Sequence, residues 1–120
     1  MNKKNTEDKK IVNKIVDLMQ DKKALNITIL NVQELTSLTD YFILCTSEST
    51  PQTKALMDHI YKSMRAEGMR PNNLEDTNTL EWVAMDYFNI VIHIFDKETR
   101  DYYQFERLWG DAEIENINEQ

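Results

Sequence analysis

Residues Tyr41–Thr46 have the sequence Tyr-Phe-Ile-Leu-Cys-Thr, and the first five form the longest uninterrupted apolar run of this 120-residue chain. A strand with one face in solvent alternates between polar and apolar residues, whereas an unbroken apolar strand is buried on both faces. The segment therefore predicts the central strand of a sheet that is covered on both sides. Five residues are far too few for a membrane span, which takes about 20 apolar residues.

The chain before and after this strand shows the periodicities of both helices and strands. Apolar residues recur at helical spacing over Glu7–Lys23, and Asn26–Val32 alternates with the period of a strand. After the central strand, Thr50-Pro51 is a helix start signal, because proline in the first turn loses no intrahelical hydrogen bond. Gly68 suits the left-handed residue that ends that helix.

The second half of the chain contains more short elements. Asn73–Thr79 is polar and suits a short edge strand, Trp82–Asp86 and Asn89–Phe95 form a hairpin, and Lys97–Leu108 forms one or two short helices. Interleaved strands and helices predict an α/β (α+β) fold with a single mixed sheet of about five strands and flanking helices. We expect one domain over residues 1–110, followed by an acidic, mobile tail over residues 111–120.

The hairpin register decides which side chains share a face. A turn centred on Tyr87-Phe88 pairs Trp82 with His93 and Ala84 with Val91. One face is then apolar, and the other carries Trp, Asp and His together. Either this mixed face is a recognition surface, or a helix covers it and His93 is a buried, hydrogen-bonded histidine. The apolar face holds Val83, Met85, Ile90 and Ile92, and the mixed face holds Trp82, Ala84, Asp86, Val91, His93 and Phe95.

Charge is spread unevenly along the chain, whose net charge is −7. Residues 71–120 carry three basic and twelve acidic groups, a net −9, whereas residues 1–23 carry seven lysines and four acids, a net +3. An acidic surface repels phosphate, so it disfavours nucleic-acid binding without sequence preference, and it attracts basic partners. The acids also serve solubility alone in many small domains. The N-terminal lysines either form a solvated helix face or touch nucleic acid.

The residues needed for common enzyme chemistries are missing. With only Gly68 and Gly110, no phosphate-binding glycine loop can be formed. Cys45, His59 and His93 are isolated in sequence, so no metal site is predicted, and a Cys45–His93 dyad lacks an orienting acid. Asp96-Lys97-Glu98 sits where it caps a helix, and no Asp-x-Asp motif occurs. We therefore expect no enzyme activity, no metal and no cofactor.

The cysteine content and the N-terminus indicate the compartment. A single cysteine excludes an intramolecular disulfide framework and fits a reducing environment. No apolar stretch follows the basic N-terminus, as a secretory signal would require. We therefore expect a cytoplasmic protein that does not bind membranes and recognises no specific nucleic-acid sequence.

Four motifs follow one another along the chain, and none is specific by itself. They are Thr39–Phe42 (TDYF), Glu81–Tyr87 (EWVAMDY), Val91–Phe95 (VIHIF) and Tyr102–Ala112 (YYQFERLWGDA). In this order they resemble the ribosomal silencing factor family, called RsfS or Iojap-like, over about Ile11 to Ala112. The chain departs from the family at three loops, and at one of them Glu75-Asp76-Thr77 replaces a usual Glu-Gly pair ahead of the tryptophan strand. Ser47–Gln52 replaces a usual Gly-Asn-Ser-x-Arg-Gln, and Phe88 replaces the glycine of the hairpin.

The resemblance implies a function without catalysis. Such proteins bind the large ribosomal subunit through its fourteenth protein, a small basic barrel, and block joining of the small subunit, so that translation is silenced. Their fold resembles that of nucleotidyltransferases without the catalytic carboxylates. A large-subunit assembly factor and a degenerate nucleotidyltransferase that retains activity are the alternatives. A homodimer of the free protein is also left open.

We predict ten residues that face the partner. Aromatic and arginine side chains lead this set because they dominate the binding energy of protein interfaces. Core packing is the alternative for all of them, and for Leu108 and Trp109 the two interpretations are equal. The ten residues are Asp40, Tyr41, Trp82, Asp86, His93, Tyr102, Tyr103, Arg107, Leu108 and Trp109.

Overall fold

The computed structural model describes residues 3–117, with side chains from Glu7 onward. Four helices and six strands make up this part of the chain. In chain order they are α1 (Lys3–Asp21), β1 (Leu25–Asn31), β2 (Tyr41–Ser47), α2 (Thr50–Ala66), β3 (Asn73–Asp76), β4 (Trp82–Tyr87), β5 (Ile90–Asp96), α3 (Lys97–Tyr103), α4 (Phe105–Leu108) and β6 (Glu113–Asn116).

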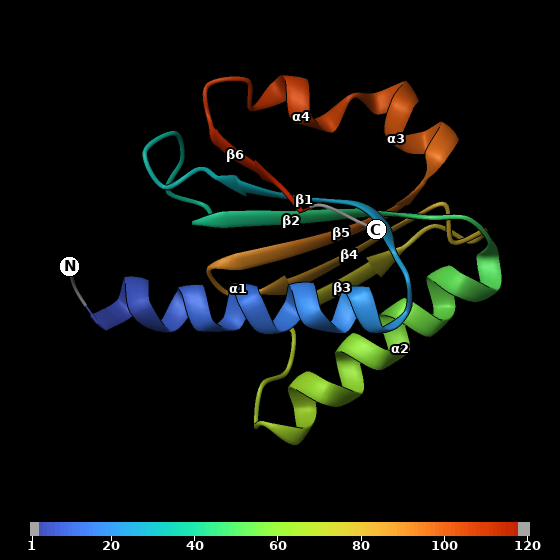
Figure 1. Ribbon diagram of the computed structural model, residues 1–120, viewed down its shortest axis with the longest axis horizontal. Helices are drawn as coiled ribbons and strands as arrows, with labels where there is room; N and C mark the ends of the chain where they lie inside the picture. Colours follow the sequence, from blue (N-terminus) through green and yellow to red (C-terminus); the bar gives the residue numbers. More distant parts are fainter. Residues whose placement is uncertain (1–2, 118–120) are drawn as a thin grey trace.

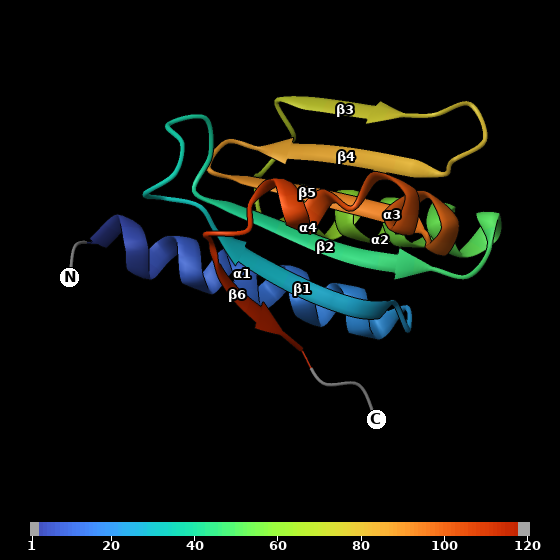
Figure 2. The same cartoon turned by 90° about the horizontal axis from the view of Figure 1, so that it is seen from above.

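The elements form three layers, with the sheet in the middle (Figure 1). Helices α1 and α2 cover one face of the sheet, and α3 and α4 cover part of the other. The strands lie in the order β3-β4-β5-β2-β1-β6, and β2 pairs in parallel with β5 while all other pairs are antiparallel (Figure 2). The predicted single mixed sheet with flanking helices is confirmed.

Strand β2 lies inside this sheet, and all seven of its residues are buried. This confirms that the unbroken apolar run Tyr41–Thr46 is a central strand. Its side chains alternate between two separate cores: Tyr41, Ile43 and Cys45 join the core under α1 and α2, whereas Phe42 and Leu44 join the core under α3 and α4.

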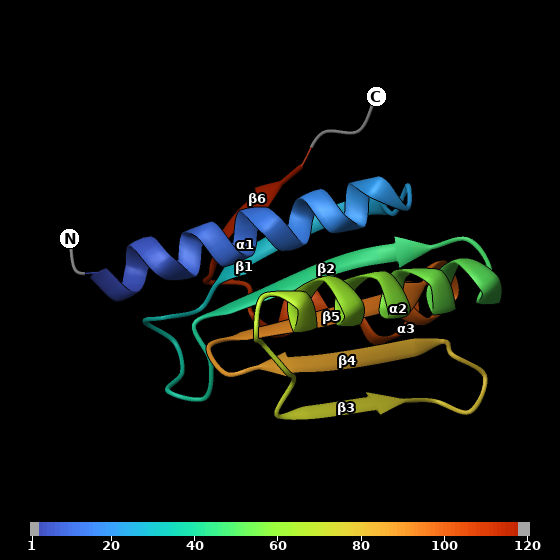
Figure 3. The same ribbon diagram turned by 90° about the horizontal axis from the view of Figure 1, so that it is seen from below.

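Helices α1 and α2 lie side by side beneath the sheet (Figure 3). Ile15 and Met19 of α1 and Ile60 and Met64 of α2 repeat every four residues, so each pair lies on one helix face, and all four are fully buried. Helix α2 begins where the sequence indicated, and its N-cap is Ser49, whose Oγ accepts a hydrogen bond from the backbone N–H of Gln52 at 3.1 Å.

The sheet has six strands, not about five, because Glu113–Asn116 forms β6 at the edge beside β1. The predicted domain boundary at residue 110 therefore cuts off a strand of the sheet. The Thr28 hydroxyl donates to Oδ1 of Asn116 at 3.1 Å, and the Ile117 N–H donates to the carbonyl of Ile27 at 2.9 Å. Because these bonds form with a strand that is distant in the sequence, the acidic residues of β6 show no local pattern that would predict a strand. Residues 118–120 of the predicted tail lie outside the described residues.

The predicted register of the β4–β5 hairpin is wrong by two residues. The turn lies at Phe88-Asn89, so Ala84 lies opposite His93, and Trp82 lies opposite Phe95. A shift of two residues leaves every side chain on its predicted face. Phe88 has a φ of 64°, a left-handed conformation that glycine usually supplies in such turns. Phe88-Asn89 therefore carries no turn signal that could be recognised in the sequence.

Candidate docking surface

Helices α3 and α4 follow β5 and are separated by a single residue. Asp96 caps α3, and its Oδ1 accepts from the backbone N–H of Thr99 at 2.8 Å. Gln104 has a φ of 49°, and its N–H still bonds to the carbonyl of Arg100, which closes α3 with a left-handed residue. The chain then restarts as α4, so that two short helices lie across the sheet above β5 and β2 (Figure 2).

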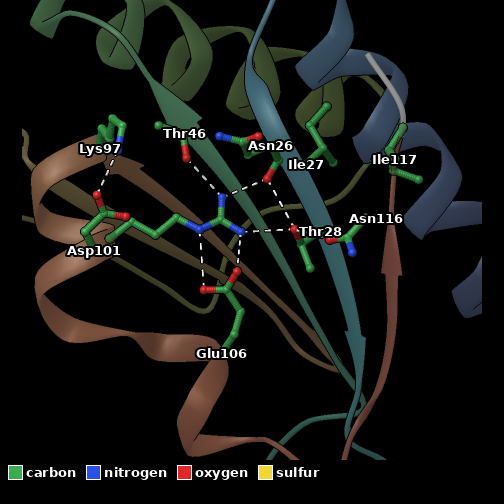
Figure 4. Close-up of a pocket in the computed structure, with 10 residues that line it drawn as sticks. Asn26, Ile27, Thr28, Thr46, Lys97, Asp101, Glu106, Asn116 and Ile117 are labelled. Atoms are coloured by element: carbon green, nitrogen blue, oxygen red, sulfur yellow. Dashed lines mark hydrogen bonds and ion pairs between the residues drawn. The ribbon is translucent and has the colours of Figure 1, made fainter.

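Arg100 of α3 holds these helices to the sheet from within a cavity, and Figure 4 labels its partners Thr28, Thr46 and Glu106. Its side chain is 9% exposed. Nη1 donates to the carbonyl of Asn26 at 2.7 Å and to the Thr46 hydroxyl at 3.0 Å, and Nη2 donates to the Thr28 hydroxyl at 3.0 Å. Glu106 accepts from Nη2 at 2.6 Å and from Nε at 3.4 Å. One guanidinium therefore joins α3 and α4 to β1 and β2.

A polar cavity of about 530 Å³ lies around Arg100 beside these helices. All five guanidinium donors already have protein acceptors, so Arg100 offers no free donor to an anion. Lys97 on its rim is paired with Asp101 at 2.9 Å. The site therefore serves to position α3 and α4. No sequence pattern points to Arg100 or Glu106, because a separation of six residues matches no side-chain pairing along one helix.

His93 lies in the core beneath α4, with 7% of its surface exposed. The Trp82 Nε1–H donates to His93 Nδ1 at 2.9 Å, so the neutral ring carries its proton on Nε2. The Phe105 ring covers it at a centroid distance of 4.5 Å. Burial lowers the pKa of His93 to about 4. For His93 the second interpretation is therefore correct, because the Phe105 ring of α4 covers it and it is a buried, hydrogen-bonded histidine.

Large apolar side chains remain exposed on the outside of these short helices. Tyr102 is 80% and Leu108 is 75% exposed, and Tyr103 and Arg107 are also exposed. The Tyr103 ring packs at 5.0 Å from Trp82, which is half-buried and extends the patch onto β4. We call Trp82, Tyr102, Tyr103, Arg107 and Leu108 the α3–α4 surface. Exposed aromatic and aliphatic groups of this size are typical of protein interaction sites.

The other predicted site residues lie elsewhere. Trp109 is half-buried against Phe42, at a centroid distance of 5.2 Å. Asp86 is half-buried on β4. Asp40 is partly exposed just before β2, whereas Tyr41 is buried in the core under α1 and α2. The pKa of the Tyr41 hydroxyl is raised by burial and by the nearby carboxylates of Asp8, Asp40 and Glu113. Of the ten predicted residues, ring contacts therefore join Trp82, Tyr103 and Tyr102, while Arg107 and Leu108 are exposed on the neighbouring α4.

The structure also bears on the chemical alternatives. Cys45 lies in the core under α1 and α2 and His93 in the other core, on opposite faces of the sheet, so the two cannot form a dyad. Among residues 3–117, no three His, Cys, Asp or Glu side chains come together as metal ligands. None of the helices in this part of the chain is long and apolar enough to cross a bilayer.

Comparisons with known proteins agree with the motifs. A family model described as "Ribosomal silencing factor during starvation" matches residues 4–120. The chain is 33% identical to the ribosomal silencing factor RsfS of Halalkalibacterium halodurans, over 85% of this chain and 90% of that protein. A crystal structure of a Chromobacterium violaceum protein superposes with a TM-score of 0.81 at 31% identity, over 85% of each chain. A more distant relative is the mouse protein "Mitochondrial assembly of ribosomal large subunit protein 1", 27% identical over 82% of this chain and 44% of that protein.

Proposed function

The chain belongs to the RsfS family of ribosomal silencing factors, and on this basis we propose that it binds the large ribosomal subunit and prevents the small subunit from joining. The observation that supports a binding role is the α3–α4 surface, where Tyr102 and Leu108 are exposed although they are large and apolar. Burying such groups is favourable by roughly 25 cal/mol for each Å² of apolar surface. The mechanism is steric exclusion in the cytoplasm and involves no chemical step.

We propose that the contact on the large subunit is its basic fourteenth protein. The net charge of −9 over residues 71–120 supports this choice, because that half of the chain contains the whole α3–α4 surface. Opposite charge speeds association and selects against acidic partners. An interface of standard size, roughly 1,600 Å² in total, is enough for nanomolar affinity.

The test is subunit joining followed by sedimentation. Purified large and small subunits are mixed with the wild-type protein, with the double variant Tyr102→Ala/Leu108→Ala, or with Leu38→Ala. Leu38 is a matched control, because it is 86% exposed but lies in the β1–β2 loop. We expect the wild type and the control to lower the joined fraction and the double variant to leave it unchanged. Sedimentation of the wild type with small subunits but not with large ones would contradict the proposal.

A role in large-subunit assembly is the second candidate, and the name of the mouse relative favours it. Cells that lack the protein distinguish the two functions. Loss of an assembly factor leaves precursor particles of the large subunit, whereas loss of a silencer leaves an excess of joined ribosomes during starvation. Sedimentation equilibrium of the free protein decides in addition whether it forms a homodimer when unbound.

A further inference from the structure

The sheet has an open area next to the α3–α4 surface. Helices α3 and α4 lie over β5 and β2 and leave β4 and β3 uncovered on the same side (Figure 2). Ala84 of β4 lies opposite Glu75 of β3 and opposite His93 of β5. Directly opposed residues point to the same face. The small Ala84 side chain therefore forms the floor of a hollow between two larger neighbours.

This hollow has a volume of about 280 Å³ and is already present in the free protein. Its aromatic wall is Trp82, whose Nε1–H is fixed by the bond to His93 and whose ring packs against Phe95 at 4.9 Å and Tyr103 at 5.0 Å. A side chain held in this way loses little freedom when a partner packs against it, which favours binding. The hollow is lined by Glu75, Asp76, Thr77, Trp82, Ala84 and His93.

The charge of the hollow has one sign. Glu75 and Asp76 are exposed, and none of the lining residues is a lysine or an arginine. Asp86 lies two residues beyond Ala84 on β4 and points to the same face. Its Oδ1 atom is buried, and it has no hydrogen-bond partner among the described residues. Asp86 does not line the hollow, so its carboxylate adds to the negative field beside the hollow and not to its wall.

We propose that this hollow binds a lysine or arginine side chain of a protein partner. The charged head group lies beside the exposed carboxylate of Glu75, which shares the face of Ala84, while Asp76 and Asp86 add to the negative field, and the methylene stem packs on the Trp82 ring. The inference rests on the proposed function, and it adds the part of the interface that recognises the basic character of the ribosomal protein. The occupant is a protein and not RNA, because three carboxylates repel a phosphate backbone.

The test compares two pairs of charge-neutralising substitutions in the full chain. Glu75→Gln/Asp76→Asn removes two charges at the hollow, and Asp17→Asn/Glu115→Gln removes two exposed charges on α1 and β6. The dissociation constant for purified large subunits is measured at about 0.1 M salt, where charges are screened over roughly 10 Å. We expect the hollow pair to weaken binding about ten-fold or more and the control pair no more than about two-fold.

Two further variants test the shape of the hollow and the sign of the occupant's charge. Ala84→Val fills the floor without a change of charge and should weaken binding, with thermal unfolding confirming that the strand persists. Glu75→Lys/Asp76→Lys should abolish binding to large subunits. Stronger binding of this variant would mean that the occupant is a phosphate and would overturn the inference.

The outcomes separate this inference from the proposed function. If the wild type does not bind large subunits, the proposed function fails and the inference fails with it. If the wild type binds and the two neutralised pairs weaken binding equally, the hollow takes no basic side chain, and the proposed function is unaffected.

Discussion

The two faces of the sheet are built from different kinds of side chain. The face under α1 and α2 is packed with aliphatic residues and methionines from two long helices of 19 and 17 residues. The face under α3 and α4 has a smaller core that contains Phe42, Phe95 and Phe105 and is bordered by Arg100 and Glu106. The first face, under α1 and α2, is held by the burial of apolar surface, which has no preferred direction. The second face, under α3 and α4, is held by ring contacts and hydrogen bonds with defined directions.

The difference in helix length explains this division. Isolated helices of seven and four residues are not stable, so α3 and α4 keep their place only through contacts with the sheet. Apolar packing alone permits short helices to slide, while the Arg100 guanidinium fixes their direction through five donors. We therefore infer that the first face supplies most of the stability and the second sets the geometry of the α3–α4 surface.

The largest expected effect tests the first face. Ile60→Ala on α2 should lower the free energy of unfolding by about 4 kcal/mol, because Ile60 is fully buried and the substitution leaves a cavity. Lys54→Ala on the same helix is the control. Its side chain is exposed, so a change within about 0.5 kcal/mol is expected. Chemical denaturation measures both. A loss for Ile60→Ala as small as that of the control would contradict the assignment of stability to this face.

The second prediction concerns the charged pair of the other face. Glu106→Gln should cost about 2–3 kcal/mol of stability, since it leaves the buried Arg100 without its counter-charge. Asp101→Asn removes the exposed partner of Lys97 on the same helix and should cost no more than about 0.5 kcal/mol.

Binding to large subunits tests the same comparison between the two faces of the sheet. At a temperature where all variants are folded, Glu106→Gln should weaken binding to large subunits more than Ile60→Ala does, although it costs less stability. The reverse order would mean that Arg100 and Glu106 do not set the geometry of the α3–α4 surface.

The two faces also differ in how far the sequence predicts them. The apolar stripes of both long helices and the run Tyr41–Thr46 predict the first face, because burial there follows local periodicity. Alternation along Val91–Phe95 places His93 on the second face correctly. It does not show what covers that face, because the position of Phe105 depends on the left-handed Gln104, which has no turn signature.

The missed parts of the site have the same cause. Arg100 gains its role from Asn26, Thr28 and Thr46, which are more than 50 residues away in sequence. The hollow over Ala84 depends on pairing with β3, a polar four-residue strand whose residues are all exposed. Residue type alone predicts Tyr102, Tyr103 and Leu108 as partner-facing, and the structure places them on the surface. Their contact with a partner stays a prediction.

The third prediction uses the buried histidine of the second face. The folded pKa of His93 is about 4, below its ordinary 6.5, because burial disfavours the charged ring. The unfolded chain therefore binds more protons between these values, so stability is lost as the pH falls from 6.5 towards 4. At pH 5 the loss from this group is about 2 kcal/mol relative to neutral pH.

His93→Gln should remove this part of the pH dependence, because glutamine does not titrate. Denaturation of both proteins at pH 7 and pH 5 measures it, and the carboxylates common to both cancel in the difference. The alternative is that packing on the second face is loose enough for water to reach the His93 ring. In that case the wild type and the variant would lose equal stability between the two pH values.

The smallest expected effect lies at the β4–β5 hairpin tip, which packs against neither face. Phe88 is exposed and has a φ of 64°, a conformation that costs a residue with a Cβ about 1–2 kcal/mol. Phe88→Gly relieves this strain but adds freedom to the unfolded chain, so we expect a net gain of about 0.5 kcal/mol. Phe88→Ala removes the same ring and keeps the strain, so it should give no gain. Equal stability of the two variants in chemical denaturation would mean that the turn is not strained. A change in the affinity of Phe88→Ala for large subunits would mean that the docking surface extends to the hairpin tip.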